Sequence, residues 1–245
     1  MKDAIALVTG ATGGLGQAIA AGLAARGATV LVHYRRNGDV AAVLCESIRE
    51  SGGTAEVVTF DLRDAEAIGE AFAAIRKDHG QLDILVNNAG IVADGPFVLL
   101  DDGGWNDVID TNLGGTFRVC RAAARLMMAR KRGVIVNVSS VAGLRASPYQ
   151  ANYSAAKAGI LGLTRTMARE LGPNGIRVNA VIPGLILSGM GERMDQRLAD
   201  AVIERIPLAH PGQAEDVAAA VVFLASSAAK YITGAELTVD GGLST

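Results

Sequence analysis

Short hydrophobic runs alternate along the chain with longer segments in which hydrophobic residues recur at helical spacing. The runs that predict strands are rich in Val, Ile and Leu and cover residues 4–9, 29–34, 54–60, 82–87, 133–139, 176–182 and 235–239. The segments that predict helices cover residues 14–26, 38–51, 64–79, 104–131, 151–171 and 214–226. Most of the runs are hydrophobic at nearly every position, which is typical of strands buried on both faces of a parallel sheet. The alternation predicts a doubly wound α/β fold, with a seven-stranded parallel sheet and helices on both faces.

The chain offers no obvious place for a domain boundary, so we expect one domain spanning residues 1–245. Residues 183–213 break the alternation and include Gly189 and Gly191 together with several prolines. This stretch follows a strand, at the side where α/β sheets bind ligands, so we expect a substrate lid at about 186–212. The alternative is a loop that carries a surface helix and has no functional role.

Composition and charge narrow the class of protein. The 23 basic and 25 acidic residues give a net charge of -2 and are scattered, which argues against broad binding of nucleic acid or of anionic membranes. No hydrophobic run approaches the roughly 20 residues of a membrane-spanning helix, and the first residues do not resemble a secretory signal. Cys45 and Cys120 are far apart, as expected of reduced thiols in a cytoplasmic protein. The three histidines are isolated, so we expect no metal site.

The first predicted strand leads into a glycine-rich turn, Thr9-Gly10-Ala11-Thr12-Gly13-Gly14-Leu15-Gly16, and a helix follows at once. Glycines let the backbone approach a pyrophosphate closely, and the helix N-terminus supplies free N–H groups and a partial positive charge. A glycine-rich turn alone is a weak signal, but a strand before it and a helix after it favour dinucleotide binding. The residues expected to contact the cofactor here are Gly10, Thr12, Gly14, Leu15 and Gly16.

The spacing of these glycines resembles the TGxxxGxG motif of the short-chain dehydrogenase/reductase family. The resemblance extends over essentially the whole chain, as far as residues 238–242, and implies a Rossmann-type domain that transfers hydride with a nicotinamide cofactor. Within the family, the chain is most similar to 3-oxoacyl-[acyl-carrier-protein] reductases. Two strings support this similarity: Gln150-Ala151-Asn152-Tyr153, and Ile206-Pro207-Leu208 in the predicted lid.

The end of the second predicted strand indicates which nicotinamide is bound. A site that prefers NAD usually has a carboxylate about 20 residues beyond the glycines, and the chain has no Asp or Glu between Ala4 and Gly38. By resemblance, Tyr34 occupies the acidic position and Arg35 the position of a base in members that prefer NADP. A guanidinium can bind the 2′-phosphate, so we expect NADPH. The alternative is that Arg35 belongs to a solvated strand end.

Further cofactor contacts are implied by the resemblance. Asp61, beside Leu62, matches the position that contacts adenine, although it could simply cap a loop. Residues 87–90 resemble the family's NNAG motif, and residues 183–188 resemble its PGxIxT segment beside the nicotinamide. The residues expected to bind the cofactor in these segments are Asp61, Leu62, Asn88, Ala89, Gly90, Pro183, Gly184, Ile186 and Ser188.

Tyr153 and Lys157 are four residues apart, so they lie on one face of the predicted helix. A phenol with a pKa near ~10 is a poor acid at neutral pH. We expect the ammonium of Lys157, with the positive nicotinamide of the oxidised cofactor, to lower the pKa of Tyr153. The pair also arises on surface helices by chance, so its meaning depends on the surrounding motifs.

The order of those motifs matches the catalytic tetrad of the family, which implies roles for four residues: Asn112, Ser140, Tyr153 and Lys157. Tyr153 would protonate the substrate oxygen, and Ser140 would donate a hydrogen bond as negative charge develops there. Lys157 would also hold the nicotinamide ribose, so Tyr153 and Lys157 count as cofactor contacts too. Asn112 would help to hold a water that relays protons to Lys157; otherwise it is a polar helix residue. Ser139 should point to the opposite face of its strand.

The similarity suggests a 3-oxoacyl thioester as substrate, with acyl carrier protein as a candidate partner. Carrier proteins are acidic, and Arg130, Lys131 and Arg132 form a basic cluster before the fifth predicted strand. By resemblance, Lys131 falls where such reductases carry a base. The cluster could instead provide favourable charge at a helix C-terminus. The second docking position is Asn174, which is not basic.

Three alternative functions have to be weighed against this interpretation. The enzyme could act on a free small ketone, sugar or alcohol, or the chain could be a dinucleotide-binding regulatory protein without activity; a methyltransferase would leave the tyrosine–lysine pair without a task. By resemblance we also expect a homo-oligomer, a dimer or tetramer, that pairs the helices at about 104–131 and 151–171.

Overall fold

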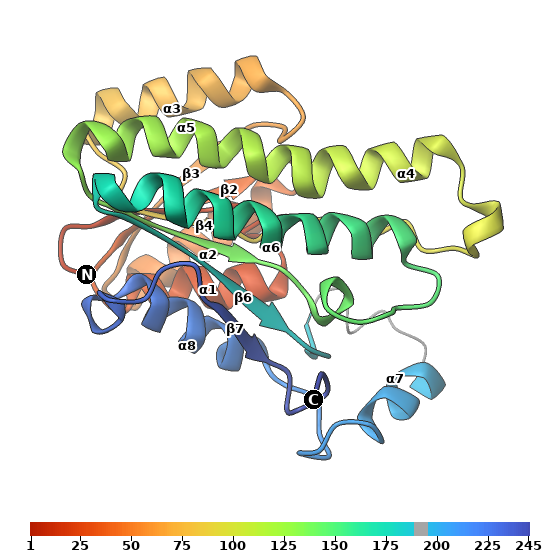
Figure 1. Ribbon diagram of the computed structural model, residues 1–245. Coiled ribbons are helices and arrows are strands. Elements are labelled where there is room, and N and C mark those ends of the chain that lie inside the picture. Colours follow the sequence, from red (N-terminus) through yellow and green to blue (C-terminus); the bar gives the residue numbers. More distant parts are fainter. Residues whose placement is uncertain (189–195) are drawn as a thin grey trace.

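Seven parallel strands form one sheet in the computed structural model, which describes residues 1–188 and 196–245 (Figure 1). The strands are β1 (Ile5–Val8), β2 (Thr29–Tyr34), β3 (Thr54–Thr59), β4 (Ile84–Asn87), β5 (Gly133–Val138), β6 (Ile176–Pro183) and β7 (Glu236–Val239). Their order is β3-β2-β1-β4-β5-β6-β7, which confirms the predicted seven-stranded parallel sheet. The order reverses between β1 and β4, and in open α/β sheets ligands bind outside the carboxyl ends of the strands at such a point.

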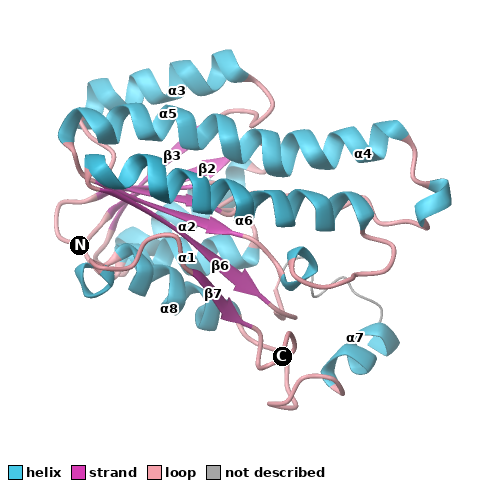
Figure 2. Cartoon of the chain, in the orientation of Figure 1, coloured by secondary structure: helices cyan, strands magenta, loops and turns pink. Residues whose placement is uncertain are grey.

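Helices cover both faces of this sheet (Figure 2). The helices are α1 (Gly14–Ala24), α2 (Gly38–Glu50), α3 (Ala65–His79), α4 (Asp102–Val108), α5 (Gly115–Arg130), α6 (Ala151–Leu171), α7 (Gln196–Ile203) and α8 (Ala214–Ala225). Helices α3, α5 and α6 lie on one face, and α1, α2 and α8 lie on the other (Figure 1). The doubly wound prediction is therefore confirmed.

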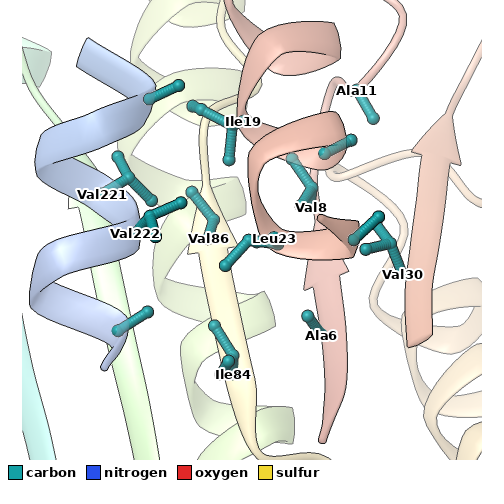
Figure 3. Close-up of a cluster of buried hydrophobic side chains, with 14 of the residues drawn as sticks. Ala6, Val8, Ala11, Ile19, Leu23, Val30, Ile84, Val86, Val221 and Val222 are labelled. Carbon is teal, nitrogen blue, oxygen red and sulfur yellow. The ribbon is translucent and has the colours of Figure 1, made fainter. Parts of the chain in front are cut away.

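Two hydrophobic cores form because successive strand residues point to opposite faces. In β1, Ala6 and Val8 pack with α1 and α8, as Figure 3 shows, whereas Ile5 and Leu7 pack with α3 and α5. All four are buried, which explains why the strands are hydrophobic at nearly every position. The sheet is thus a rigid base for the loops at its carboxyl edge.

The predicted helix at 104–131 differs most from the structure. It consists of α4, a π-helical segment η2 (Ile109–Gly114) and α5. Helix α7 lies inside the stretch 183–213, where a surface helix was foreseen only in the alternative to the lid. Short 3₁₀ turns η1 (Phe97–Leu99) and η3 (Val141–Gly143) follow β4 and β5. Single π-turns are frequent at functional sites, and η2 contains Asn112 of the predicted tetrad.

Two properties bear on the expectations from composition. Cys45 and Cys120 are both buried free thiols, and burial raises the pKa of Cys120 to about 12, which makes it unreactive. Within residues 1–188 and 196–245, none of the helices combines the length and the hydrophobicity that crossing a membrane requires.

Candidate active site

The glycine-rich turn packs too tightly for side chains at two of its positions. Gly10 has φ +62°, and a Cβ there would lie 2.8 Å from the Cα of Ala89. A Cβ on Gly16 would lie 2.4 Å from the carbonyl oxygen of Gly10. Helix α1 begins directly at this turn, and Gly13 before it has no side chain to cap the first N–H groups. The turn therefore presents backbone donors to an anionic ligand.

Asn88 fastens the turn to the neighbouring strand. Its side-chain amide donates to the carbonyl oxygens of Thr9 at 3.1 Å and Gly10 at 3.0 Å. The Thr9 hydroxyl in turn accepts from the backbone N–H groups of Asn88 at 3.0 Å and Ala89 at 3.1 Å. Asn88 thus acts on the shape of the turn, and Thr9, which the sequence reasoning did not single out, completes the brace.

His33 is a second residue that sequence reasoning missed. Its Nδ1 accepts a hydrogen bond from the Gly10 N–H at 3.1 Å, and its Nε2 lies 3.1 Å from the Phe60 carbonyl oxygen. Because Nδ1 must accept and Nε2 must donate, the neutral Nε2–H tautomer is the one that satisfies both partners. Burial is the main reason why the pKa of His33 is lowered to about 4. A polar residue inside a fully buried strand was the available signal.

The ion pair of Arg35 and Asp61 lies at the adenosine end of the turn, where Tyr34 and Leu62 also line the cleft. The Nη1 of Arg35 is 3.4 Å from Oδ2 of Asp61, and both side chains are about 31% exposed. Partial burial opposes ionisation of Asp61, but hydrogen bonds and charge from Arg63, with the charge of Arg35, lower its pKa overall. The structure therefore brings together two residues that were assigned to different parts of the cofactor.

Asn112 lies in the π-helical segment η2 and is fully buried. Its Oδ1 accepts from the Ile91 N–H at 2.8 Å, and its Nδ2 donates to the Ile91 carbonyl oxygen at 2.9 Å. Both polar atoms therefore hold the loop that follows β4, and Asn112 is not among the described residues that line the cleft. The structure gives Asn112 a positioning contact rather than one in the cleft itself.

Ser140 and Tyr153 meet where β5 ends. The Ser140 hydroxyl accepts from the Ala142 N–H at 3.2 Å, and the Ser139 hydroxyl donates to the Lys157 carbonyl oxygen at 2.8 Å. Both serines line the cleft and contact α6, so the expectation that Ser139 points to the opposite face of the strand, away from the site, is wrong. Burial raises the pKa of Tyr153 to about 12; the hydrogen bond with Ser140 lowers it, and the charge of Asp94 raises it.

Lys157 is buried beside Tyr153, and its ammonium donates to the Val138 carbonyl oxygen at 2.8 Å. Its Nζ lies over the Tyr153 ring, 5.5 Å from the ring centre. Burial lowers the pKa of Lys157 to about 8. In the protein alone burial dominates and the pKa of Tyr153 is raised; the lowering expected from Lys157 together with the oxidised nicotinamide stays a prediction.

One cleft of about 960 Å³ joins these features. It is lined by the predicted cofactor residues Gly10, Thr12, Gly14, Leu15, Gly16, Tyr34, Arg35, Asp61, Leu62, Asn88, Ala89, Gly90, Pro183, Gly184, Ile186 and Ser188, and by Ser140, Tyr153 and Lys157. Thr111 also lines it, and its buried hydroxyl has no hydrogen-bond partner among the described residues. A tight glycine turn, a basic corner and an unsatisfied hydroxyl in one long cleft fit a phosphorylated dinucleotide.

The predicted lid is fastened at both of its ends. The Gly212 N–H donates to the Leu185 carbonyl oxygen at 3.0 Å, and the Leu187 N–H donates to the Gly212 carbonyl oxygen at 2.9 Å. From this stretch Val202 and Arg205 line the cleft together with Ile186 and Ser188. Gly189 and Gly191 lie outside the described residues.

The basic cluster at 130–132 is not brought to the cleft. It precedes β5, whereas Ser140 follows the end of β5, and a strand of this length spans roughly 20 Å. Arg130 donates to Gln81, Arg132 pairs with Asp83 at 2.5 Å, and Lys131 is the left-handed C-cap of α5 at φ 50°. Within one chain the cluster therefore lies at the opposite edge of the sheet, with local partners.

A phosphate-binding turn and a buried phenol beside an amine, placed along one cleft at the switch point of the sheet, are features of dinucleotide-dependent oxidoreductases. The chain belongs to the short-chain dehydrogenase/reductase family. Residues 10–244 match the family described as enoyl-(acyl carrier protein) reductase. Enzymes of this kind are expected to use a dinucleotide cofactor.

The chain is similar in sequence to proteins named 3-oxoacyl-[acyl-carrier-protein] reductases and in structure to proteins named gluconate dehydrogenases. It is 43% identical over 238 residues to 3-oxoacyl-[acyl-carrier-protein] reductase FabG of Staphylococcus aureus (strain N315), covering 97% of each chain. It is 42% identical over 240 residues to 3-oxoacyl-[acyl-carrier-protein] reductase of Synechocystis sp., covering 98% of this chain and 96% of the relative. Among solved structures, a gluconate 5-dehydrogenase from Burkholderia cenocepacia J2315, in complex with NADP and tartrate, is 34% identical with a TM-score of 0.94, covering 99% of this chain and 96% of that one. A putative gluconate dehydrogenase from Agrobacterium tumefaciens is 39% identical with a TM-score of 0.96, covering 100% and 97%.

Proposed function

We propose that the protein is an NADPH-dependent reductase that converts a ketone to a secondary alcohol, with Tyr153 as the proton donor. The observation that carries the proposal is the meeting of Ser140 and Tyr153 in the cleft that also holds the glycine-rich turn. When bound, NADPH supplies the hydride that forms the new C–H bond at the carbonyl carbon.

The side chains of the protein act on the oxygen. Tyr153, whose pKa is raised by burial, is protonated at neutral pH and gives its phenolic proton to the carbonyl oxygen as the C=O double bond becomes a single bond. Ser140 donates a hydrogen bond to that oxygen while charge develops. The ammonium of Lys157, with a pKa of about 8, lies over the ring of the phenolate that remains and stabilises it until solvent returns a proton.

Asn112 acts on this site through the loop after β4. Its two hydrogen bonds to Ile91 fix the position of Ala89 and Gly90 in the wall of the cleft. The family role, in which this asparagine helps to hold a proton-relaying water, remains our prediction.

NADPH rather than NADH is supported by Arg35. The guanidinium lies at the adenosine end of the cleft, and no carboxylate follows the glycines before Gly38 to repel a 2′-phosphate. Asp61, which pairs with Arg35, would have to share this guanidinium with the phosphate. Dissociation constants for NADPH and NADH, measured on wild type and Arg35→Gln, test the preference; equal constants in wild type would contradict it.

For the substrate we propose first a 3-oxoacyl thioester carried by acyl carrier protein, because the two curated relatives above are named for that reaction. A second candidate is a free small ketone or sugar acid. It is favoured by the position of the basic cluster 130–132, away from the cleft, and by two structural relatives named gluconate dehydrogenases.

A substrate panel separates these candidates and tests the reductase proposal. NADPH oxidation is followed with 3-oxoacyl carrier protein, 3-oxoacyl thioesters, oxo acids and neutral ketones, with NADH in parallel. A value of kcat/KM on the carrier protein well above that on the free ketones supports the first candidate. If the folded protein binds NADPH but reduces none of these ketones, a regulatory role is favoured.

We also propose that residues 186–212 act as a lid and that the chain forms a homo-oligomer. The lid is supported by Val202 and Arg205, which line the cleft from this stretch. Oligomerisation is supported by Trp105, Phe117 and Met128, large apolar residues exposed on α4 and α5. Sedimentation velocity tests the assembly; a monomer at micromolar concentration would contradict it.

A further inference from the structure

Two arginines lie at the substrate end of the cleft without a carboxylate partner among the described residues. Arg145 and Arg205 line the same cleft as Ser140 and Tyr153. The guanidinium of Arg145 donates to the carbonyl oxygen of Leu243, and no ion pair of either arginine is seen in residues 1–188 and 196–245. Arg35, at the other end of the cleft, is paired with Asp61.

The C-terminal segment brings the two arginines to one margin of the cleft. Arg145 follows η3 and contacts Leu243, which itself lines the cleft. On the other side, the residues after Arg205 pack on the same segment: a Cβ on Gly241 would lie 2.7 Å from Ile206, and the Leu208 N–H donates to the Gly241 carbonyl oxygen at 3.2 Å. Figure 1 shows the C-terminus next to α7, the helix that leads to Arg205.

This end of the cleft carries both a negative charge, on Asp94, and positive charges, on Arg145 and Arg205. Asp94 accepts a hydrogen bond from Gln150 at 3.0 Å, and its negative charge acts on the Tyr153 hydroxyl. The cation beside Tyr153 is Lys157, whereas Arg145 and Arg205 line the cleft. A negatively charged group of a substrate is therefore repelled by Asp94 and attracted by Arg145 and Arg205.

We propose that Arg145 and Arg205 form a subsite for an anionic group of the substrate, and that this group orients the ketone toward Tyr153. The inference rests on the proposed function and narrows its substrate class. The group is either the carboxylate of a free oxo acid or the phosphate of a phosphopantetheine thioester, since guanidinium groups bind both oxyanions through paired hydrogen bonds.

Pairs of substrates that differ in this charge test the proposal. With NADPH present, kcat and KM are measured for 3-oxobutanoate against its neutral ethyl ester, and for acetoacetyl-coenzyme A against the neutral N-acetylcysteamine thioester. The variants are Arg145→Gln, Arg205→Gln, their double variant, the charge-preserving Arg205→Lys, and the matched control Arg169→Gln on an exposed turn of α6.

We expect the wild type to prefer the anionic member of one pair, mainly through KM. Each glutamine substitution should reduce that preference by about tenfold, the size of one lost charge-assisted hydrogen bond, and Arg205→Lys should retain part of it. A change in the first pair identifies a carboxylate, and a change in the second pair identifies a phosphate. The neutral members and Arg169→Gln should be unaffected.

A binding measurement separates failure of this inference from failure of the proposed function. L-Tartrate and phosphopantetheine are titrated into the enzyme saturated with NADP, with and without the double substitution. If no ketone is turned over but one of these anions binds and the double variant loses it, the subsite stands and the reductase proposal falls. If ketones are turned over but charge brings no preference, or the double variant keeps the preference, the subsite is refuted.

Discussion

His33 ties the glycine-rich turn to the third strand, and each of its ring nitrogens can be replaced separately. In His33→Asn the new side-chain amide places an oxygen near the position of Nδ1, whereas in His33→Gln the amide lies near the position of Nε2. His33→Asn therefore keeps the acceptor for the Gly10 N–H, and His33→Gln keeps the donor to the Phe60 carbonyl oxygen. Only His33→Gln should distort the turn that binds the cofactor.

The structure sets the size of both effects. Each variant leaves one group at a buried hydrogen bond without its partner, which costs about 1–3 kcal/mol of the free energy of unfolding. His33→Gln should also weaken NADPH binding by about tenfold, because the free Gly10 N–H belongs to the phosphate turn. His33→Asn should bind NADPH within about threefold of wild type, since a difference that small is under 1 kcal/mol.

The same residue makes stability depend on pH. The pKa of His33 falls from 6.5 in the unfolded chain to about 4 in the folded protein, chiefly through burial, although the nearby charge of Asp61 and the bond to Phe60 oppose this. The unfolded chain therefore binds a proton before the folded protein does. The contribution is complete above pH 6.5 and is lost as pH falls toward 4, by about 3 kcal/mol in total.

Urea unfolding at pH 7 and pH 5 measures the free energy of unfolding and its dependence on pH, and NADPH fluorescence titrations measure the affinity for the cofactor. His79→Gln, at the C-terminal end of α3, is the matched control and should leave NADPH binding unchanged. Both His33 variants should lose the part of the pH dependence that His33 supplies. The reasoning is refuted if His33→Gln binds NADPH as well as His33→Asn does, or if the pH dependence survives in both.

Three further substitutions have defined outcomes. Tyr149 has an exposed side chain and a left-handed backbone at φ 69°. Tyr149→Gly should therefore raise the melting temperature, because relief of the backbone strain stabilises the folded protein by about 1 kcal/mol; an unchanged or lower melting temperature contradicts this. Lys157→Met should abolish turnover yet raise the free energy of unfolding at pH 7 by about 1–3 kcal/mol, because burial of the charged amine lowers the pKa of Lys157 from 10.5 to about 8. The wild-type cost of burying this charge disappears only as pH rises from 8 to 10.5, so chemical denaturation at pH 7 and pH 10 checks the sign. Gly16→Ala should abolish NADPH binding while the circular dichroism spectrum stays that of wild type, because its Cβ would lie 2.4 Å from the Gly10 carbonyl oxygen; tight binding would show that the turn adapts.

Much of the fold could be predicted because the central strands of the sheet are buried on both faces. Continuous runs such as residues 4–9 and 133–139 are hydrophobic for that reason, and helices with one buried face separate them. The π-helical turn could not be predicted, because the sequence Ile109–Gly114 is compatible with an ordinary helix. Its wider geometry accompanies the two hydrogen bonds from Asn112 to Ile91, which are tertiary contacts.

The candidate site was predictable where spacing determines it and not where distant contacts do. Tyr153 and Lys157 share a helix face through their spacing, but the bond from Lys157 to Val138 joins two elements and was not expected. The role of His33 likewise depends on Gly10 and Phe60, which are distant in sequence. The position of Arg130–Arg132 could have been inferred, because residues that precede a parallel strand lie at the edge opposite to the cleft.

The central claim is that the Tyr153 hydroxyl supplies the proton, and removal of that one oxygen tests it most directly. Turnover of the best ketone with NADPH and the NADPH dissociation constant are measured side by side for wild type and Tyr153→Phe. The account predicts a fall in kcat of about a thousandfold or more, with NADPH affinity nearly unchanged. A variant that reduces the ketone within about tenfold of the wild-type rate would show that the proton comes from elsewhere.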